Sequence, residues 1–378
     1  MYNKVVKVAL EHRFYQYEGS IYTKLSFPYS YWQDYLGFFD KVIIVARVKE
    51  VSGIDESYKL VTGDNVKFFS MPYYVGTREF FYNLPRLLYS AHKATKGKEP
   101  LLLRSGNIAN LVWLYAMLKK LPYLREYPGN IKEGILGYGG TSIVNKILAN
   151  LLNSFAKIQA RYSRANSYVS EYCKNLYPSS NKSYVFSSFN ADEIDLKKEN
   201  FSVGKSIKLI SVGRLEGEKG HQDLINALGD LDIPVELTII GDGTKMPELQ
   251  KSATDLNVTV RFLGAVTNRA LLFGYLADSD IFVIPSHTEG MPRALLEAMA
   301  VGLTCIGANV GGIPEVLEKE MLFVPNNPTA CGNKIKELAS DNDLMRKQSS
   351  RNLAFIEDNY SKSALDNRKI NFWSELYK

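Results

Sequence analysis

The sequence predicts an α/β protein of two Rossmann-like domains, each an open, largely parallel sheet with helices on both faces. The length of 378 residues provides for two hydrophobic cores. Short β-branched segments alternate with helical patterns along both halves. A polar segment, 187–204, separates the two series. We therefore expect a first domain over residues 1–190 and a second over 200–360, with a final helix at about 361–378 packing back on the first.

The first half begins with a strand predicted at Val5–Leu10, and the polar segment Glu11–Tyr22 is expected to form a loop. Lys41–Val48 is continuous and β-branched, which is typical of a buried parallel strand. Further strands are predicted at Val66–Ser70, Leu101–Arg104 and Leu121–Glu126, and helices at Phe80–Lys96 and Asn107–Lys120.

The segment Ser142–Arg164 predicts a long amphipathic helix. Apolar residues recur at near-helical spacing, and four basic residues lie among them. Such a helix suits an anionic membrane surface, or it covers the sheet as an ordinary helix with its polar face in water. The residues that define the pattern are Ile143, Ile147, Leu151, Phe155 and Ile158, with Lys146, Lys157, Arg161 and Arg164.

The second half repeats the alternation of strands and helices. Strands are predicted at Ile207–Val212, Val235–Gly241, Val258–Leu263, Ile281–Pro285 and Thr304–Gly307. Helices are predicted at His221–Gly229, Met246–Leu256, Asn268–Ala277 and Pro292–Val301.

The composition is that of a globular protein, with 46% hydrophobic and 23% charged residues. The three cysteines lie far apart without a CxxC pair, which argues against a disulfide framework or a structural zinc site and favours a reducing cytosol. We find no signal peptide and no run of about eighteen apolar residues. The sequence therefore predicts a cytoplasmic protein without a membrane-spanning segment.

Charge is distributed unevenly between the halves. Residues 1–190 carry 25 Lys and Arg against 13 Asp and Glu, a net +12, and residues 191–378 carry 21 against 27, a net −6. A basic first domain suggests an anionic partner, which is a membrane surface, a phosphate-bearing acceptor or nucleic acid. A solvated basic face without a partner is the alternative.

The strongest functional signal is the segment Pro285–Glu315. A buried strand is predicted to end at Pro285, and a helix to open at Pro292 with free N–H groups that favour a diphosphate. Glu297 lies roughly 7–8 Å along this helix and leans back towards its start. Glu289 and Glu297 therefore flank the anion site, where carboxylates accept hydrogen bonds from sugar hydroxyls. The pattern predicts a nucleotide sugar, and a simple contact of each carboxylate with the helix dipole is the alternative.

A second signal follows the first predicted strand of the second half. In SVGRLEGEKG, Gly213, Arg214 and Lys219 come after a strand end, where two cations suit a phosphate, although lone loop cations are usually solvated. Gly243 in IGDG and the pair Gly311–Gly312 in VGGIPE either allow close backbone approach or form tight turns.

Together these motifs resemble family 4 of the retaining glycosyltransferases, which have the GT-B fold of two facing Rossmann-like domains. SVGRL, EKG, GDG, PSHTEG, LLEAMAVG and GGIPE occur in the family's order over most of residues 207–317. The resemblance implies transfer of a sugar, with retention, from a nucleotide-sugar donor to a hydroxyl of a saccharide or lipid-linked saccharide, in cell-surface polysaccharide synthesis. It implies no separate cofactor and no metal ion, because the cations and the helix N-terminus would neutralise the diphosphate.

The resemblance also implies roles for individual residues. Arg214 and Lys219 match the cations that neutralise the donor diphosphate. Glu289 matches the carboxylate that contacts the transferred sugar, and Glu297 matches the one that binds the ribose. The other positions that match donor contacts are Gly213, Gly243, Leu263, Gly264, His287, Gly290, Met291 and Pro292, with the base expected near Phe262–Gly264.

The first half departs from the family pattern. Many members carry a glycine pair after the first strand, where Gly19 and Ser20 are the nearest equivalent, and a catalytic-side histidine where Pro128 stands here. The histidines expected near the cleft are His12 and His287. The strand-end candidates for acceptor contacts are Arg104, Arg125 and Glu126.

Three other functions remain as alternatives. A nucleotide-sugar epimerase would keep the fold and the donor site but would convert the donor without an acceptor. A cofactor-bearing phosphorylase would need a Schiff-base lysine, for which no candidate stands out. A non-enzymatic nucleic-acid binder rests only on the basic half, since no zinc-finger, RRM-like or helix-turn-helix signature is found.

Overall fold

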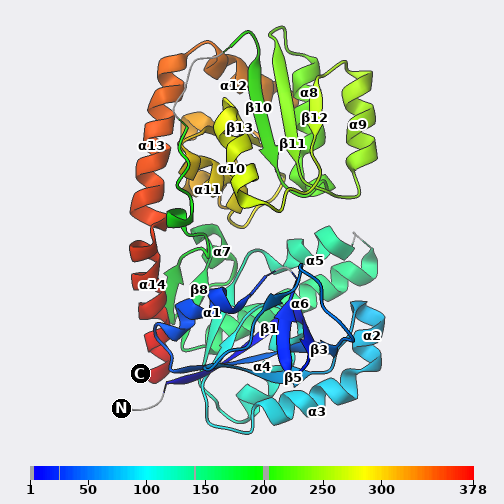
Figure 1. Ribbon diagram of the computed structural model, residues 1–378, viewed down its shortest axis with the longest axis vertical. Coiled ribbons are helices and arrows are strands. Elements are labelled where there is room, and N and C mark those ends of the chain that lie inside the picture. Colours follow the sequence, from blue (N-terminus) through cyan, green and yellow to red (C-terminus); the bar gives the residue numbers. More distant parts are fainter. Residues whose placement is uncertain (1–3, 25, 140–141, 199–203) are drawn as a thin grey trace.

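The computed structural model describes residues 4–24, 26–139, 142–198 and 204–378. Two α/β units are stacked along the long axis of the molecule, each built on its own sheet (Figure 1). This arrangement confirms the predicted fold class. The predicted linker 187–204 lies between the two sheets, and 199–203 fall outside the described residues.

The first sheet has a parallel centre and a small antiparallel edge. Its strands are β1 (Val5–Tyr17), β2 (Ser20–Thr23), β3 (Lys41–Glu50), β4 (Lys59–Leu60), β5 (Val66–Met71), β6 (Leu101–Leu103), β7 (Tyr123–Tyr127), β8 (Ala165–Tyr168) and β9 (Lys182–Val185). Strand β1 lies between β3 and β6 in the parallel part, and β2 and β4 add to its far end in antiparallel fashion. The helices of this unit are α1 (Tyr29–Leu36), α2 (Gly76–Tyr82), α3 (Leu84–Ala94), α4 (Asn107–Leu118), α5 (Ile131–Gly139), α6 (Ile143–Tyr162) and α7 (Glu171–Leu176).

The predicted strand Val5–Leu10 is only the first part of β1. The loop predicted over Glu11–Tyr22 is wrong, because β1 continues alongside β3 after a register shift and then turns into β2. Glu18 (φ 45°) and Gly19 (φ 79°) form that turn, and two left-handed residues suit the twist of a two-residue hairpin. Within this extension Phe14 supplies the buried side chain, and the other residues of Glu11–Tyr17 are partly or fully exposed, which suits polar side chains.

The helix predicted over Phe80–Lys96 is two helices, α2 and α3. The break falls at Asn83, two residues before Pro85. Proline lacks an N–H and disfavours helical geometry in the residue before it, so a new helix starts with proline in its first turn.

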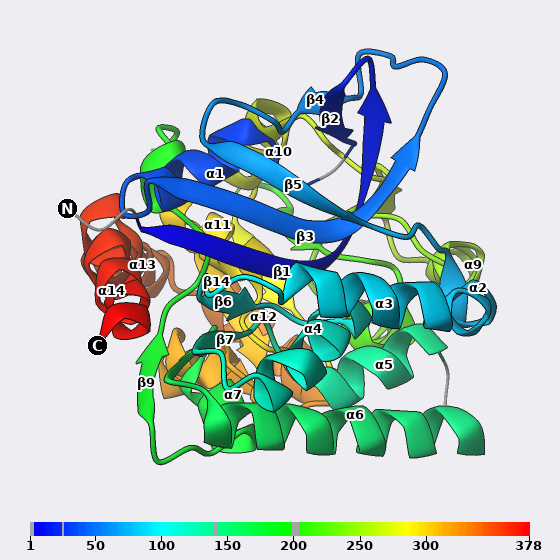
Figure 2. The same ribbon diagram turned by 90° about the horizontal axis from the view of Figure 1, so that it is seen from below.

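The predicted amphipathic helix forms as α6, with the hydroxyl of Ser142 accepting a hydrogen bond from the backbone N–H of Asn145. Its packed face consists mainly of small residues, whereas larger apolar side chains face solvent at Ile143, Val144, Ile147, Leu151 and Ile158. Figure 2 shows α6 along the outer side of the first unit. In the described part of the chain, no helix is long and apolar enough to cross a membrane.

The second sheet is entirely parallel, in the order β12-β11-β10-β13-β14-β15. Its strands are β10 (Ile207–Val212), β11 (Val235–Ile240), β12 (Val260–Phe262), β13 (Ile281–Ile284), β14 (Thr304–Ala308) and β15 (Leu322–Phe323). Its helices are α8 (His221–Gly229), α9 (Met246–Asp255), α10 (Arg269–Asp278), α11 (Arg293–Val301), α12 (Pro328–Ala339) and α13 (Asn342–Tyr360). The chain order reverses between β10 and β13, which makes the carboxyl ends of these two strands the switch point of the sheet.

The last helices connect the two units. Helix α13 packs on the second sheet, and after a break at Ser361 helix α14 (Lys362–Ser374) runs along the first unit (Figures 1 and 2). Phe372 and Trp373 are buried in the core of the first sheet, and the ring of Trp373 lies 4.8 Å from that of Tyr35. The end of the described chain is therefore part of the first core.

Candidate active site

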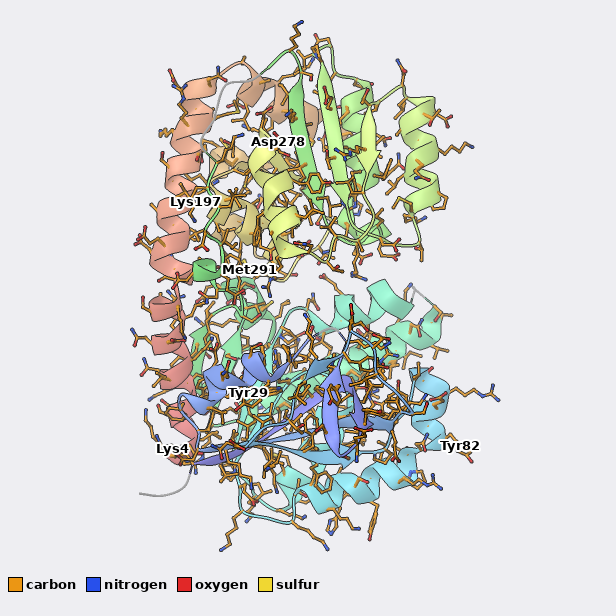
Figure 3. All side chains as sticks on the ribbon, viewed as in Figure 1. Lys4, Tyr29, Tyr82, Lys197, Asp278 and Met291 are labelled. Carbon is orange, nitrogen blue, oxygen red and sulfur yellow. The ribbon has the colours of Figure 1, made fainter. Side chains whose placement is uncertain are left out.

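The candidate site lies at the carboxyl ends of β10 and β13, where the second unit faces the first. Open α/β sheets form a ligand crevice outside such a switch point. The loop after β10 carries Gly213 to Gly220, and the loop after β13 carries Pro285 to Pro292. Figure 3 shows Met291 of the second loop at the junction between the two units.

Glu289 is in direct contact with Lys219. One carboxylate oxygen, Oε1, accepts hydrogen bonds from Lys219 Nζ at 2.7 Å and from Ser286 Oγ at 2.8 Å. The side chains of Lys219 and Glu289 are 20% and 10% exposed. Within the described chain no partner reaches the other oxygen, Oε2, which is left to accept hydrogen bonds from a ligand.

The second predicted cation also faces a carboxylate. Arg214 Nη2 lies 2.7 Å from Glu218 Oε1, and the Arg214 side chain is 44% exposed. Because exposed ion pairs are weak, a phosphate can compete for this guanidinium at little cost. Both predicted cations are therefore at the same edge of the sheet, each paired with a carboxylate.

Two glycines allow the loops to meet at this edge. Gly220 has φ 68°, and a Cβ there would lie 2.1 Å from the carbonyl oxygen of Pro285. Gly311 has φ 56°, and a Cβ there would lie 1.8 Å from the carbonyl oxygen of Glu289. Only glycine combines a left-handed backbone with such close approach, so these positions fix the loop that carries Glu289.

The remaining predicted glycines lie around the same crevice. A Cβ on Gly243 would meet the backbone of Leu215 at 2.4 Å, whereas one on Gly213 would meet nothing closer than 3.8 Å. Gly264 has φ 66° and open space around it, and its carbonyl accepts a hydrogen bond from the backbone N–H of Gly241. Leu263 beside it is half-buried. The predicted base segment therefore follows β12, two strands away from β10.

Glu297 lies in the second turn of α11, which Pro292 precedes as the N-cap residue. The carboxylate is almost fully buried, and its Oε1 contacts Arg269 Nη1 at 3.2 Å and Arg293 Nε at 3.1 Å. Sequence reasoning missed both arginines. The i,i+4 spacing of Arg293 and Glu297 was a signal for one of them.

His287 has a structural partner. Its Nε2 lies 2.7 Å from Asp223 Oδ2, and its backbone N–H donates to the carbonyl of Glu218 at 2.9 Å. These bonds tie the loop after β13 to the loop after β10 and to the first turn of α8. The geometry therefore gives His287 a role in holding the two loops together.

The first unit contacts the donor-side loops directly. A Cβ on Gly290 would lie 3.1 Å from the Cα of Gly129, which follows Pro128 at the end of β7. The hydroxyl of Thr288 donates to the carboxylate of Glu133 on α5. Sequence reasoning missed Glu133, because only the arrangement of the two units brings it to the site.

A second contact between the units involves the GGIPE motif. The carboxylate of Glu315 accepts hydrogen bonds from the backbone N–H groups of Glu171 and Tyr172, at 2.8 and 2.6 Å. These N–H groups open α7 and have no partner within their own helix. Glu315 therefore fastens the second unit to the first.

The acceptor-side candidates differ in accessibility. Arg104 Nε and Glu126 Oε2 form an ion pair of 3.0 Å, and Arg104 also donates to the hydroxyl of Tyr31 at 2.5 Å. Arg125 is 1% exposed, and its guanidinium is bonded to Gln159 and to backbone carbonyls. The prediction of Arg125 as an acceptor contact is therefore wrong, because its side chain points into the packing beneath α6.

His12 lies in the first unit beside a polar cavity of about 420 Å³. Its Nε2 is 2.8 Å from the hydroxyl of Thr23. Burial, followed by the nearby charges of Arg47, Arg13 and Arg104, lowers the pKa of His12 to about 4. The imidazole is therefore neutral at physiological pH.

Comparison with known proteins finds similarity to glycosyltransferases. A family model described as glycosyl transferases group 1 matches residues 192–353. Protein CapJ of Staphylococcus aureus is 27% identical over 366 residues, which cover 92% of each chain. The N-acetyl-alpha-D-glucosaminyl L-malate synthase of Bacillus anthracis is 33% identical over 171 residues, 43% of this chain and 44% of that protein.

The fold is shared along the whole chain. The solved glycosyltransferase of Rickettsia africae ESF-5 superposes with a TM-score of 0.69 at 18% identity, covering 100% of both chains. The protein thus has the two-domain GT-B fold, and its residues 192–353 match the glycosyl transferases group 1 family.

Proposed function

We propose that the protein is a retaining glycosyltransferase of the family 4 type. It takes a sugar from a nucleotide-sugar donor and transfers it to a hydroxyl of a saccharide or lipid-linked saccharide acceptor. The observation that carries this proposal is the contact of Lys219 with Glu289 at the switch point of the second sheet. Glu297, whose carboxylate contacts Arg269 and Arg293, supplies a second carboxylate, which would accept hydrogen bonds from the ribose hydroxyls.

When the donor binds, the charged side chains of the site give up their ion pairs with one another and contact the donor instead. The diphosphate takes Lys219 and Arg214 away from Glu289 and Glu218, and the transferred sugar offers its hydroxyls to Glu289. The cations then stabilise the negative charge that develops on the leaving nucleoside diphosphate. We propose no separate cofactor and no metal ion for this step.

The acceptor oxygen bonds to the anomeric carbon on the face from which the diphosphate leaves, so configuration is retained. The acceptor proton passes to an oxygen of the departing diphosphate. Pro128 and Gly129 border this position from the first unit, and no histidine is needed for the proton transfer. Glu289 holds the sugar throughout by accepting hydrogen bonds from its hydroxyls.

A thermal-shift panel of UDP-, GDP- and ADP-sugars tests the donor proposal. A true donor raises the melting temperature in proportion to the logarithm of its concentration over Kd, and this rise shrinks in Lys219→Met. Stabilisation of wild type by none of these donors would refute the proposal. Mass-neutral conversion of the donor without any acceptor would instead favour the epimerase.

We also propose that the enzyme works in the cytoplasm and takes part in the synthesis of cell-surface polysaccharide. In this proposal α6 binds to the surface of an anionic membrane. The exposed Ile143, Ile147 and Leu151 on this helix, together with Lys146, support this contact. Sedimentation with vesicles containing anionic lipid tests it. Binding should fall in Ile147→Ser and persist in Ile370→Ser, an exposed apolar residue of α14.

A further inference from the structure

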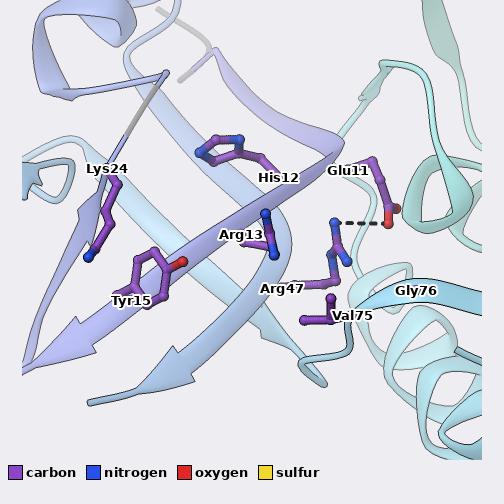
Figure 4. Close-up of a pocket in the computed structure, with 8 residues that line it drawn as sticks. All are labelled: Glu11, His12, Arg13, Tyr15, Lys24, Arg47, Val75 and Gly76. Atoms are coloured by element: carbon purple, nitrogen blue, oxygen red, sulfur yellow. Dashed lines mark ion pairs between the residues drawn. The ribbon is translucent and has the colours of Figure 1, made fainter. Parts of the chain in front are cut away.

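The cavity beside His12 has a basic lining that the donor site does not use. His12, Arg13 and Tyr15 come from the extension of β1, Arg47 comes from β3, and Lys24 follows β2 (Figure 4). Glu11 is the one carboxylate among the lining residues. A volume of about 420 Å³ is within the range of small-molecule sites.

Arg47 is built into the wall of this cavity. It is 8% exposed, its Nη1 donates to the carbonyl of Tyr74 at 2.7 Å, and its Nη2 lies 3.1 Å from Glu11 Oε1. Among the described residues its buried Nε has no hydrogen-bond partner. Glu11 is itself occupied by the backbone N–H of Ile108 and by the hydroxyl of Tyr74. The Nε–H group of this buried guanidinium is therefore a hydrogen-bond donor without an acceptor in the described chain, in the wall of the cavity.

The other two cations of the lining, Lys24 and Arg13, are less firmly paired with carboxylates than Arg47 is. Lys24 Nζ lies 3.9 Å from Asp55, whose side chain is largely exposed, and no carboxylate of the described chain lies within ion-pair distance of Arg13. Figure 4 shows Arg13 between the Arg47–Glu11 pair and Lys24. Three cations against one carboxylate leave the lining with a net positive charge.

The pKa of His12 reflects the positive electrostatic potential of the same cavity. Burial and then Arg47, Arg13 and Arg104 lower its pKa to about 4. Positive potential disfavours the imidazolium, so an anion in the cavity would have the opposite effect.

The register of the first sheet relates this cavity to the donor site. Ala9 of β1 is level with Leu103, and Leu103 is level with Arg125. Beyond these pairs β1 continues through Glu11, and β7 ends at Tyr127, which immediately precedes the Pro128–Gly129 contact with the loop after β13. Two strand spacings, about 10 Å, separate β1 from β7 along this edge. The cavity thus lies at the same carboxyl end of the first sheet as the Pro128–Gly129 contact.

We propose that this cavity binds a phosphate group of the acceptor, held by Arg13, Lys24 and Arg47. The proposal rests on the transferase function above and narrows its acceptor to a phosphorylated saccharide or a lipid-linked saccharide phosphate. The charge anchors the acceptor at one end, so that a hydroxyl at the other end reaches the sugar at Glu289.

Histidine NMR on the full chain tests binding without any donor. The chain has four histidines, and His12→Gln identifies the His12 signal. Inorganic phosphate or diphosphate should raise the pKa of His12 from about 4 and leave that of His92, on α3, unchanged. In Arg13→Gln and Lys24→Gln the affinity for phosphate should fall by about tenfold each. Lys157→Gln, which removes an exposed charge on α6, should bind phosphate as wild type does.

The outcomes are separable from those of the donor experiments. A His12 pKa that does not change with either phosphate, or that changes equally with neutral methyl glucoside, overturns the proposal. A response to glucuronate but not to phosphate overturns the assignment of the group as a phosphate. A phosphate-bearing saccharide should compete with inorganic phosphate, and a lipid-linked diphosphate in detergent should compete more strongly if the acceptor is lipid-linked. Because no donor is present in this experiment, phosphate can bind in the cavity even if no nucleotide sugar binds at the donor site. Equally, a nucleotide sugar can bind at the donor site even if the cavity binds no phosphate.

Discussion

Replacing Glu289 by glutamine separates sugar recognition from diphosphate binding. The amide keeps an acceptor oxygen for Lys219 and Ser286, whose bonds are 2.7 and 2.8 Å, but loses the charge at the open Oε2. A hydrogen bond to a charged group contributes about 1.5–3 kcal/mol, so kcat/KM for the donor should fall roughly 10- to 150-fold. Lys219 loses its counter-charge and remains available to the diphosphate. The Kd of the free nucleoside diphosphate should therefore stay within about threefold, since that ligand lacks the transferred sugar that Glu289 contacts.

The assay combines donor kinetics with calorimetric titration of the nucleoside diphosphate. Glu218→Gln is the matched control, because it neutralises a carboxylate of the same site that pairs with Arg214 rather than facing the sugar. Its kcat/KM should stay near wild type or rise by up to about fivefold as Arg214 is released. The reasoning is wrong if Glu289→Gln retains kcat/KM within twofold, or if it loses affinity for the nucleoside diphosphate to the same degree as for the donor.

Three further predictions concern other parts of the molecule. Glu297→Gln should raise KM for the donor about tenfold or more with kcat little changed, and an unchanged KM would remove this carboxylate from the ribose site. Gly290→Ala, whose methyl group would lie 3.1 Å from Gly129, should lower kcat on the order of tenfold while donor Kd measured by calorimetry holds; a wild-type kcat would show that this contact is not needed. Burial alone would raise the pKa of Glu375, but hydrogen bonds, led by that from Lys182, lower it to about 2. Because the folded pKa is depressed, this stability is complete above the unfolded value of about 4.3 and is lost as pH falls through about 2. Melting temperatures between pH 6 and 3 should decline less steeply in Glu375→Gln, and equal slopes would contradict the assignment.

The strands, loops and helices that carry the proposed donor site could be predicted from sequence because their signals are local. The strand, loop and helix around Pro285–Glu315 follow from period and capping, and α8 spans the predicted residues His221–Gly229. The spacing of Glu289 and Glu297 then follows from helix geometry. Their partners were less visible, since Arg269 comes from a different helix and Lys219 from a different loop.

The acceptor side could not be predicted in the same way. The extension of β1 carries no strand pattern in the sequence, because only Phe14 among its side chains is buried, and the cavity beside His12 is lined by this extension together with β3. Arg125 looked accessible at a strand end, yet its neighbours α6 and β6 enclose it. Burial of a charged side chain depends on contacts from distant segments, which a local pattern does not contain.

The helix pair at the end of the described chain has a consequence for how the protein is made. The core of the first unit includes Phe372, Trp373 and Leu376, which a ribosome delivers only after the whole second unit. Domains usually fold in the order of synthesis, the N-terminal one first. Here the aromatic surface around Trp32 and Tyr35 stays uncovered until α14 emerges, so the second unit can be finished before the first.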